Sequence, residues 1–330
     1  MTTVGIIANP ASGRDIRRLV THATVLDNEE KVNIVRRVLL GLESVGVDRV
    51  WIMPESYGIG HKALDGLKTH LDVSILSMST TFTQDDTKRA AEFMVRDGVS
   101  CLVTIGGDGT NRAVAKTCAD VPLVPISTGT NNAFPSMIEG TIAGMAAGLV
   151  ARGVAHETVQ TMPRLDVFTG VDDAAPDEVA LVDAAVYEGH FVAARALLDA
   201  TRVKEVVLTR AEAGNIGLSA IGAHVHDGSR SPDQGLYLRL ELGGQRVLAP
   251  IAPGVVINVS VAEHRLLNPG DEVLIERTDP YVLAFDGERE MAGPSGESVR
   301  IRLNARGPRV VDAARALEVA ASEGVFVESP

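Results

Sequence analysis

The stretch Ile105-Gly106-Gly107-Asp108-Gly109-Thr110-Asn111 has residue types suited to handling a phosphate group. It follows an apolar run at 101–105 and precedes a helix-like run at 112–118, which predicts a strand, a glycine turn and a helix in succession. Glycines let the backbone approach a bulky anion, and the first amides of a following helix point at it. Asp108 would repel phosphate, so it suits a divalent metal or the proton of an attacking hydroxyl. A plain turn capped by Asp108 and Thr110 is the alternative.

Two further polar turns follow apolar runs in the same half of the chain. They are Asn9-Pro10-Ala11-Ser12-Gly13 after Val4–Ala8, and Thr128-Gly129-Thr130-Asn131-Asn132 after 121–126. Repeated alternation of strand and helix predicts a parallel sheet with right-handed crossovers. Strand-to-helix turns of such a sheet lie at one edge, so we expect these turns to line one ligand crevice.

Helical spacing of apolar residues predicts the helices that carry these turns. We expect helices over 28–45, 56–67, 83–96 with Thr83 as cap, and 136–151, and strands over 49–53 and 72–78. A helix after the first turn would begin with Arg14 and Arg17. Cations oppose the helix dipole there, so they indicate either a bound anion or a solvated face.

The pattern changes after Gly153 to short alternating runs separated by turns rich in Gly, Pro and Asp, such as Gly243-Gly244. Many short strands predict an antiparallel sandwich or barrel-like domain, interrupted by a helix near 191–203 and followed by a helix at 312–322 that docks back. We therefore expect an α/β domain at 1–153, a β-sandwich domain at 154–310 and a C-terminal helix at 311–330. The expected strands are 159–168, 179–187, 205–209, 236–242, 255–261, 272–276, 281–285 and 299–303.

Composition limits the classes of partner. The 330 residues carry a net charge of −12, which argues against nucleic acid or an anionic membrane as partner but is compatible with a nucleotide in a local cleft. Cys101 and Cys118 lie in apolar surroundings and read as buried, reduced thiols. No signal peptide or membrane-spanning run is evident, so we expect a cytoplasmic protein.

One histidine motif and several absent motifs bear on other kinds of site. His224-Val225-His226 would place two imidazoles on one face of a strand, as a metal pair needs, but a solvent-facing surface is the alternative because no third ligand accompanies them. The sequence contains no Walker A motif, no Gly-x-Gly-x-x-Gly in the first turn and no Gly-x-Ser-x-Gly elbow. These absences disfavour P-loop enzymes, standard dinucleotide oxidoreductases and serine hydrolases.

The three turns, together with a later Asp286-Gly287-Glu288, resemble the ATP-NAD kinase superfamily, which includes the diacylglycerol and sphingosine kinases. The closest resemblance is to the ATP-NAD kinase-like or acetoin-catabolism protein X branch, and it covers nearly the whole chain. It implies a Rossmann-like α/β N-terminal domain with a parallel sheet, a C-terminal antiparallel β-sandwich and an active crevice between them.

The resemblance also implies roles for individual residues. Asp108 would be the catalytic residue and a magnesium partner, and Asn131 and Asn132 would contact the nucleotide. Asp286, Gly287 and Glu288 would complete a magnesium site or form a hairpin turn without function. The remaining implied nucleotide-binding residues are Asn9, Ser12, Gly13, Gly106, Gly107, Gly109, Thr110, Thr128, Gly129 and Thr130.

One departure concerns the acceptor. NAD kinases carry an Asn-Glu pair and a Thr-Pro-Thr-Gly-Ser-Thr-Ala-Tyr run, of which only Ser219-Ala220 and nearby glycines remain here. The resemblance implies an ATP- and Mg²⁺-dependent kinase that forms homo-oligomers and phosphorylates NAD to NADP. The alternatives are a kinase for a small hydroxylated metabolite linked to acetoin catabolism, or a nucleotide-binding regulatory protein without turnover. The donor, ATP or polyphosphate, is left open.

Overall fold

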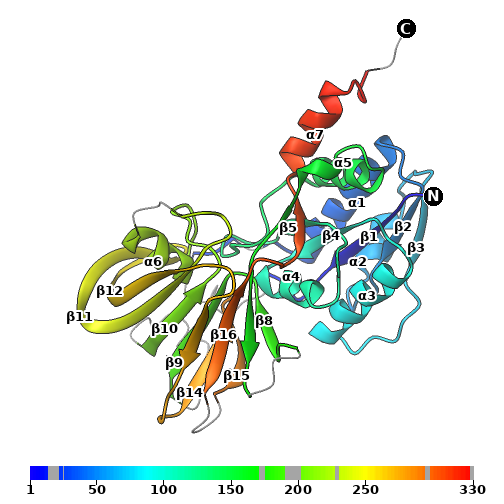
Figure 1. Ribbon diagram of the computed structural model, residues 1–330. Coiled ribbons are helices and arrows are strands. Elements are labelled where there is room, and N and C mark those ends of the chain that lie inside the picture. Colours follow the sequence, from blue (N-terminus) through cyan, green and yellow to red (C-terminus); the bar gives the residue numbers. More distant parts are fainter. Residues whose placement is uncertain are drawn as a thin grey trace.

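The protein has two lobes, seen in a computed structural model (Figure 1). Helices surround one sheet in the first lobe, and the remaining sheets form the second. The structure describes residues 1–13, 22–24, 26–170, 175–189, 202–226, 230–293 and 298–327, without the side chains of 288–290. Arg14, Arg17 and most of the helix expected near 191–203 lie outside these residues.

The first sheet has the strand order β3-β2-β1-β4-β5-β17-β6. Its first five strands pair in parallel, as the alternation of strands and helices predicted. β17 runs parallel to β5 and antiparallel to β6, although the chain reaches it only after the second domain. The strands are β1 (Thr3–Ala8), β2 (Arg49–Ile52), β3 (Asp72–Ile75), β4 (Cys101–Gly106), β5 (Leu123–Ser127), β6 (Val159–Thr161) and β17 (Arg309–Val311).

Helices cover this sheet at the predicted places. The expected cap is confirmed, because the Thr83 side chain accepts a hydrogen bond from the Asp85 amide at the start of α3. α1 and α5 approach closely at glycines, and a Cβ on Gly144 would lie 2.3 Å from the Val38 carbonyl oxygen. The helices are α1 (Asn28–Ser44), α2 (Ile59–Leu64), α3 (Gln84–Arg96), α4 (Asp108–Ala115) and α5 (Gly140–Ala151).

The predicted start of α5 near Ser136 is wrong. Ser136 forms an isolated bridge with Ile126, and its carbonyl accepts from the Ser127 amide at 2.8 Å, which holds this segment extended. The helix begins at Gly140, where the Glu139 side chain caps the amides of Thr141 and Ile142.

The second domain is antiparallel, as predicted. A larger sheet has the order β12-β11-β10-β9-β14-β15, and a smaller one has the order β13-β16-β7-β8. Buried side chains of both sheets, among them Val186, Leu283 and Ile301, form one core. The strands are β7 (Arg164–Phe168), β8 (Glu178–Ala180), β9 (Asp183–Glu188), β10 (Val203–Leu208), β11 (Gly235–Ala252), β12 (Val255–Leu267), β13 (Glu272–Ile275), β14 (Tyr281–Phe285), β15 (Glu288–Ala292) and β16 (Val299–Asn304).

Two local predictions in this domain are wrong. Gly243-Gly244 does not end a hairpin but forms an irregularity inside β11, where Gly243 has a φ of 90° and the register to β12 shifts. His224 lies on helix α6 (Leu218–Val225) rather than on a strand. The helix forms because Leu218, Ile221 and Val225 recur at helical spacing and pack on the larger sheet.

The chain ends on the first domain. Helix α7 (Ala313–Ser322) is capped by Asp312 and buries Ala316 and Ala320 in the core that also contains residues of α1 and α5. Cys101 and Cys118 are buried and unpaired, and burial raises the pKa of their thiols to about 12 and about 11. In the described part of the chain, no helix is both long and apolar enough to cross a membrane.

Candidate functional site

The three polar turns meet at the carboxyl edge of the first sheet, as predicted. The side-chain nitrogen of Asn9 donates to Thr110 Oγ1 at 2.9 Å, which joins the first turn to the glycine turn. Thr128 Oγ1 lies 3.2 Å from Ser12 Oγ, which joins the first turn to the third. Side-chain hydrogen bonds therefore fix the relative positions of segments more than 100 residues apart in the sequence.

The glycine turn needs its glycines because neighbouring side chains touch its backbone. A Cβ on Gly106 would lie 2.5 Å from Thr110 Oγ1, and a Cβ on Gly107 would lie 2.8 Å from Asn132 Oδ1. Gly107 is also the N-cap of α4, so the first amides of this helix begin immediately after it. This arrangement suits an oxyanion at the helix start.

Asp108 is the first residue of α4, and its side chain reaches the third turn. Its carboxylate accepts from the amides of Ala133 at 3.1 Å and Phe134 at 2.7 Å. The residue is only 8% exposed, yet it lines a cavity. These contacts fix the direction of the carboxylate beside the cavity.

The two asparagines of the third turn differ in their surroundings. Asn132 supports the turn itself, since its amide nitrogen donates to Ser127 Oγ at 2.9 Å and its oxygen lies 3.4 Å from the Asp108 amide. Asn131 lines the same cavity as Asp108. Thr130 Oγ1 accepts from the Thr24 amide at 3.4 Å.

Asp286 organises a second acidic turn, between β14 and β15. Its carboxylate accepts from the amides of Leu181 at 3.0 Å, Val182 at 2.7 Å and Asp183 at 3.2 Å. The side chain is fully buried, and its φ of 53° places the backbone in the left-handed region. Both carboxylate oxygens are thus engaged with the backbone of the 181–183 segment.

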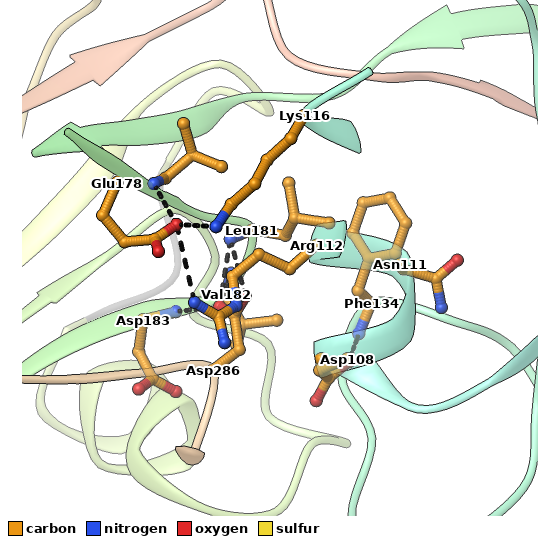
Figure 2. A network of polar contacts seen from close by, with 12 residues as sticks. Asp108, Asn111, Arg112, Lys116, Phe134, Glu178, Leu181, Val182, Asp183 and Asp286 are labelled. Atoms are coloured by element: carbon orange, nitrogen blue, oxygen red, sulfur yellow. Dashed lines mark hydrogen bonds and ion pairs between the residues drawn. The ribbon is translucent and has the colours of Figure 1, made fainter. Parts of the chain in front are cut away.

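A buried cation connects this turn to the helix after the glycine turn (Figure 2). Arg112 of α4 has no exposed side-chain surface, and its Nε lies 3.4 Å from Asp286 Oδ2. The same guanidinium lies 3.6 Å from Glu178 Oε1, which also pairs with Lys116. The network therefore joins both domains directly beside Asp108.

Burial raises the pKa of Asp286 from 3.8 to about 6. The charge of Arg112 opposes this rise, and the negative charge of Asp108 reinforces it. The dependence on Asp108 indicates that the two acidic turns lie close enough to influence each other electrostatically. Gly287 lines the cavity beside them, whereas the Glu288 side chain lies outside the described residues.

Three buried cations that support the site were not predicted from the sequence. Lys31 of α1 is fully buried and donates to the carbonyls of Asn9 at 2.9 Å and Ser12 at 2.7 Å. Arg210 donates to the Ala133 carbonyl at 2.8 Å and stacks near the Phe134 ring. Like Arg112, both are charged side chains at positions where the local sequence pattern predicts exposure to solvent.

Two cavities flank the glycine turn. The outer cavity has a volume of about 500 Å³ and is lined by Asn9, Gly109, Thr110 and the segments 53–57 and 82–87. The inner cavity is smaller, about 50 Å³, and lies at the domain junction. Its lining combines apolar side chains such as Val182, Val203, Leu218 and Ile251 with Asp108, Asp183 and Asp286.

The histidine motif lies apart from this junction. His224 Nδ1 lies 2.8 Å from the Leu248 carbonyl oxygen, and the His226 ring packs edge-on against His264 with centroids 6.0 Å apart. Within the described ranges, no group of three or more His, Cys, Asp or Glu side chains is arranged to hold a metal ion.

Two family models match this chain, one in each half. Residues 4–154 match the ATP-NAD kinase N-terminal domain, and residues 163–306 match the acetoin catabolism protein X C-terminal domain. A solved structure of yeast NADH kinase, complexed with NADH, superposes with a TM-score of 0.54 over 100% of this chain and 89% of that chain. Its sequence identity is 14%, so this likeness concerns the fold.

A much closer relative identifies the family. Acetoin catabolism protein X of Cupriavidus necator is 39% identical over 324 residues, covering 94% of this chain and 90% of that protein. The chain belongs to the acetoin catabolism protein X family, whose fold is that of the NAD kinases.

Proposed function

We propose that the protein is a kinase of the ATP-NAD kinase type, which transfers the terminal phosphate of ATP to a hydroxyl group. One observation carries this proposal: the glycine turn separates two cavities, with Gly109 and Thr110 on the outer one and Asp108 on the inner one. The terminal phosphate of a donor bound in the outer cavity can then lie on the turn and face an acceptor bound in the inner cavity.

The outer cavity suits the donor. Its volume of about 500 Å³ falls in the range of small-molecule sites, so a nucleoside fits there. The amides at the start of α4 are placed to receive phosphate oxygens. Asn9 and Thr110, already bonded to each other, form the wall nearest the turn.

Asp108 acts on the acceptor. The acceptor oxygen attacks the terminal phosphorus, the bond from that phosphorus to the bridging oxygen breaks, and ADP leaves with the bond electrons. Asp108 takes the hydroxyl proton as the new phosphorus–oxygen bond forms. The amides of Ala133 and Phe134 hold its carboxylate in one orientation for this transfer.

Magnesium would neutralise charge on the transferring phosphate, and the residues present fit an ion that arrives with ATP. Asp108, together with the donor phosphates, would hold it. Asp286 does not fit as a ligand, because its carboxylate has no exposed surface and is already paired with the Arg112 guanidinium. We therefore assign Asp286 the role of positioning the acidic turn and Arg112.

The inner cavity favours a small, uncharged alcohol as acceptor. Its carboxylates oppose entry of the anionic pyrophosphate of a dinucleotide. The relationship to acetoin catabolism protein X supports a metabolite of that kind. NAD is the acceptor expected from the resemblance to NAD kinases, and it is the second candidate.

The test is ATP consumption with Mg²⁺ in the presence of uncharged diols and hydroxyketones, with NADP formation from NAD followed separately. Asp108→Asn keeps an oxygen for the amides of Ala133 and Phe134 but accepts no proton. We expect it to lower turnover by about 10²- to 10⁴-fold and to preserve ADP binding. NADP formation by the wild type would select the second candidate. ADP binding without turnover of any acceptor would overturn the kinase proposal in favour of a nucleotide-binding regulatory protein.

A further inference from the structure

The outer cavity carries an aromatic side chain held in an unusual conformation. Phe82 has a φ of 59°, one of three positive values among the described residues other than glycine. An aromatic residue rarely adopts this conformation, because its Cβ crowds the backbone. The Phe82 side chain is also 67% exposed, so burial of the ring in the protein core does not account for its position.

A buried acid maintains this conformation. The Asp86 carboxylate accepts from the Thr81 amide at 2.9 Å, the Thr81 hydroxyl at 3.0 Å and the Phe82 amide at 2.6 Å. Burial raises the pKa of Asp86, but these bonds and that from Arg89 outweigh it, and the pKa is lowered. Asp86 is therefore ionised at neutral pH, and the turn around Phe82 is fixed before any ligand binds.

The same segment is tied to the glycine turn. Gln84, two residues after Phe82, donates from Nε2 to the Gly109 carbonyl at 2.9 Å. The outer cavity is bounded by Gly109 and Thr110 and also by Phe82 and Tyr57. A ligand with phosphates on the glycine turn can therefore extend its other end to an aromatic wall.

Tyr57 is already engaged. Its hydroxyl donates to Glu29 at 2.5 Å, and the Lys62 ammonium lies 3.4 Å from its ring centroid. Phe82 instead is largely exposed and is one of the residues that line the cavity. Aromatic rings of this kind bind nucleobases by stacking, because every base has a π face.

We propose that Phe82 stacks on the base of the donor nucleotide and makes the outer cavity prefer a nucleoside triphosphate to inorganic polyphosphate. This inference rests on the proposed function only in placing the donor in the outer cavity. Asp86 and Gln84 are positioning residues for Phe82, since they fix its backbone relative to the glycine turn.

Calorimetric binding of two probes tests the proposal. ADP carries a base and tripolyphosphate does not. We expect Phe82→Ala to weaken ADP binding by about 10- to 100-fold, the range of base–aromatic stacking, and to change tripolyphosphate binding less than about twofold. Phe82→Trp should retain ADP binding. Phe326→Ala removes another exposed aromatic ring, outside the cavity, and should change neither affinity.

A second variant separates stacking from folding. Phe82→Gly removes the ring but suits a positive φ, so we expect it to fold at least as well as the wild type and still lose ADP affinity. Unchanged ADP affinity in Phe82→Ala and Phe82→Gly would overturn the proposal. Equal weakening of both probes would also overturn it, because it would show a general disturbance of the cavity.

These outcomes are distinct from those of the kinase assay. Binding of ADP that depends on Phe82, without turnover of any acceptor, would support the stacking role and reject the kinase. Turnover of ATP together with unchanged ADP affinity in the Phe82 variants would support the kinase and reject the stacking role. A wild-type protein that bound neither probe would reject both.

Discussion

Arg112 and Asp286 form a fully buried ion pair across the two domains, with Arg112 Nε 3.4 Å from Asp286 Oδ2 (Figure 2). Arg112 lies one helical turn after Asp108, and Asp286 anchors the segment that lines the inner cavity. The pair therefore links the residue proposed to receive the proton to the walls that surround the acceptor.

We expect Arg112→Met to destabilise the protein by about 3–5 kcal/mol, because it leaves the Asp286 carboxylate buried without its cation. Urea unfolding measures this loss. Lys116→Met is the matched control, since Lys116 pairs with Glu178 at a partly exposed position and should cost less than about 1 kcal/mol.

A double variant checks the cause. Arg112→Met combined with Asp286→Asn should be destabilised by clearly less than the sum of the two single variants, because the unpaired charge is gone. Strict additivity would show that the two side chains act independently and would contradict the pairing argument.

The raised pKa of Asp286 predicts a pH effect on stability. Between its ordinary value of 3.8 and its folded value of about 6, the folded state holds a proton that the unfolded state has lost. The contribution of Asp286 to stability is therefore full below pH 3.8, falls as the pH rises to about 6, and is constant above. The two values correspond to a loss of roughly 3 kcal/mol.

The measurement compares wild type with Asp286→Asn by urea unfolding from pH 4 to 8, because carboxyl groups far from position 286 titrate equally in both proteins. The unfolding free energy of the wild type minus that of Asp286→Asn should fall as the pH rises to about 6 and should stay constant above it. A difference independent of pH would mean that the pKa of Asp286 is the same in both states.

The glycine turn should tolerate no side chain at its first glycine. Gly106→Ala places a methyl group 2.5 Å from Thr110 Oγ1 and pushes Thr110 away from Asn9. We expect a loss of about 1–3 kcal/mol in urea unfolding and a rise in the KM for ATP. Gly170→Ala, whose Cβ would meet no atom within 4 Å, should change neither quantity.

Lys31 should be needed for the first turn. Lys31→Met removes the ammonium that satisfies the carbonyls of Asn9 and Ser12 in a buried position. We expect a loss of about 2–4 kcal/mol and weaker ADP binding by calorimetry, since the turn beside Thr110 loses its support. The exposed Lys68→Met is the control, and an equally small effect in both variants would contradict a structural role for Lys31.

The framework of the site could be predicted from sequence because local rules determine it. An apolar run, a glycine turn and a helix-like run at 101–118 specify strand, turn and helix with little help from the remainder of the chain. The edge rule of parallel sheets then brings Asn9, Gly106 and Thr128 together, as the hydrogen bonds of Asn9 and Ser12 show.

The contacts across domains could not be predicted in this way. The pairing of Arg112 with Asp286 joins positions 174 residues apart, and a lone arginine on a short helix reads as a solvated face. The sequence also does not show which of the two asparagines contacts Ser127, which is Asn132, and which lines the inner cavity, which is Asn131. The prediction of a strand at His224 is wrong because a run of small and apolar residues fits either a strand or a helix until its packing partner is known.

The place of β17 has a consequence for synthesis of the chain. This strand lies between β5 and β6, although about 150 residues of the second domain are translated before it. The first sheet therefore stays split on the ribosome until residue 311 emerges, and Ala316 and Ala320 of α7 complete its core only afterwards. The domain that begins first is thus the one that finishes folding last.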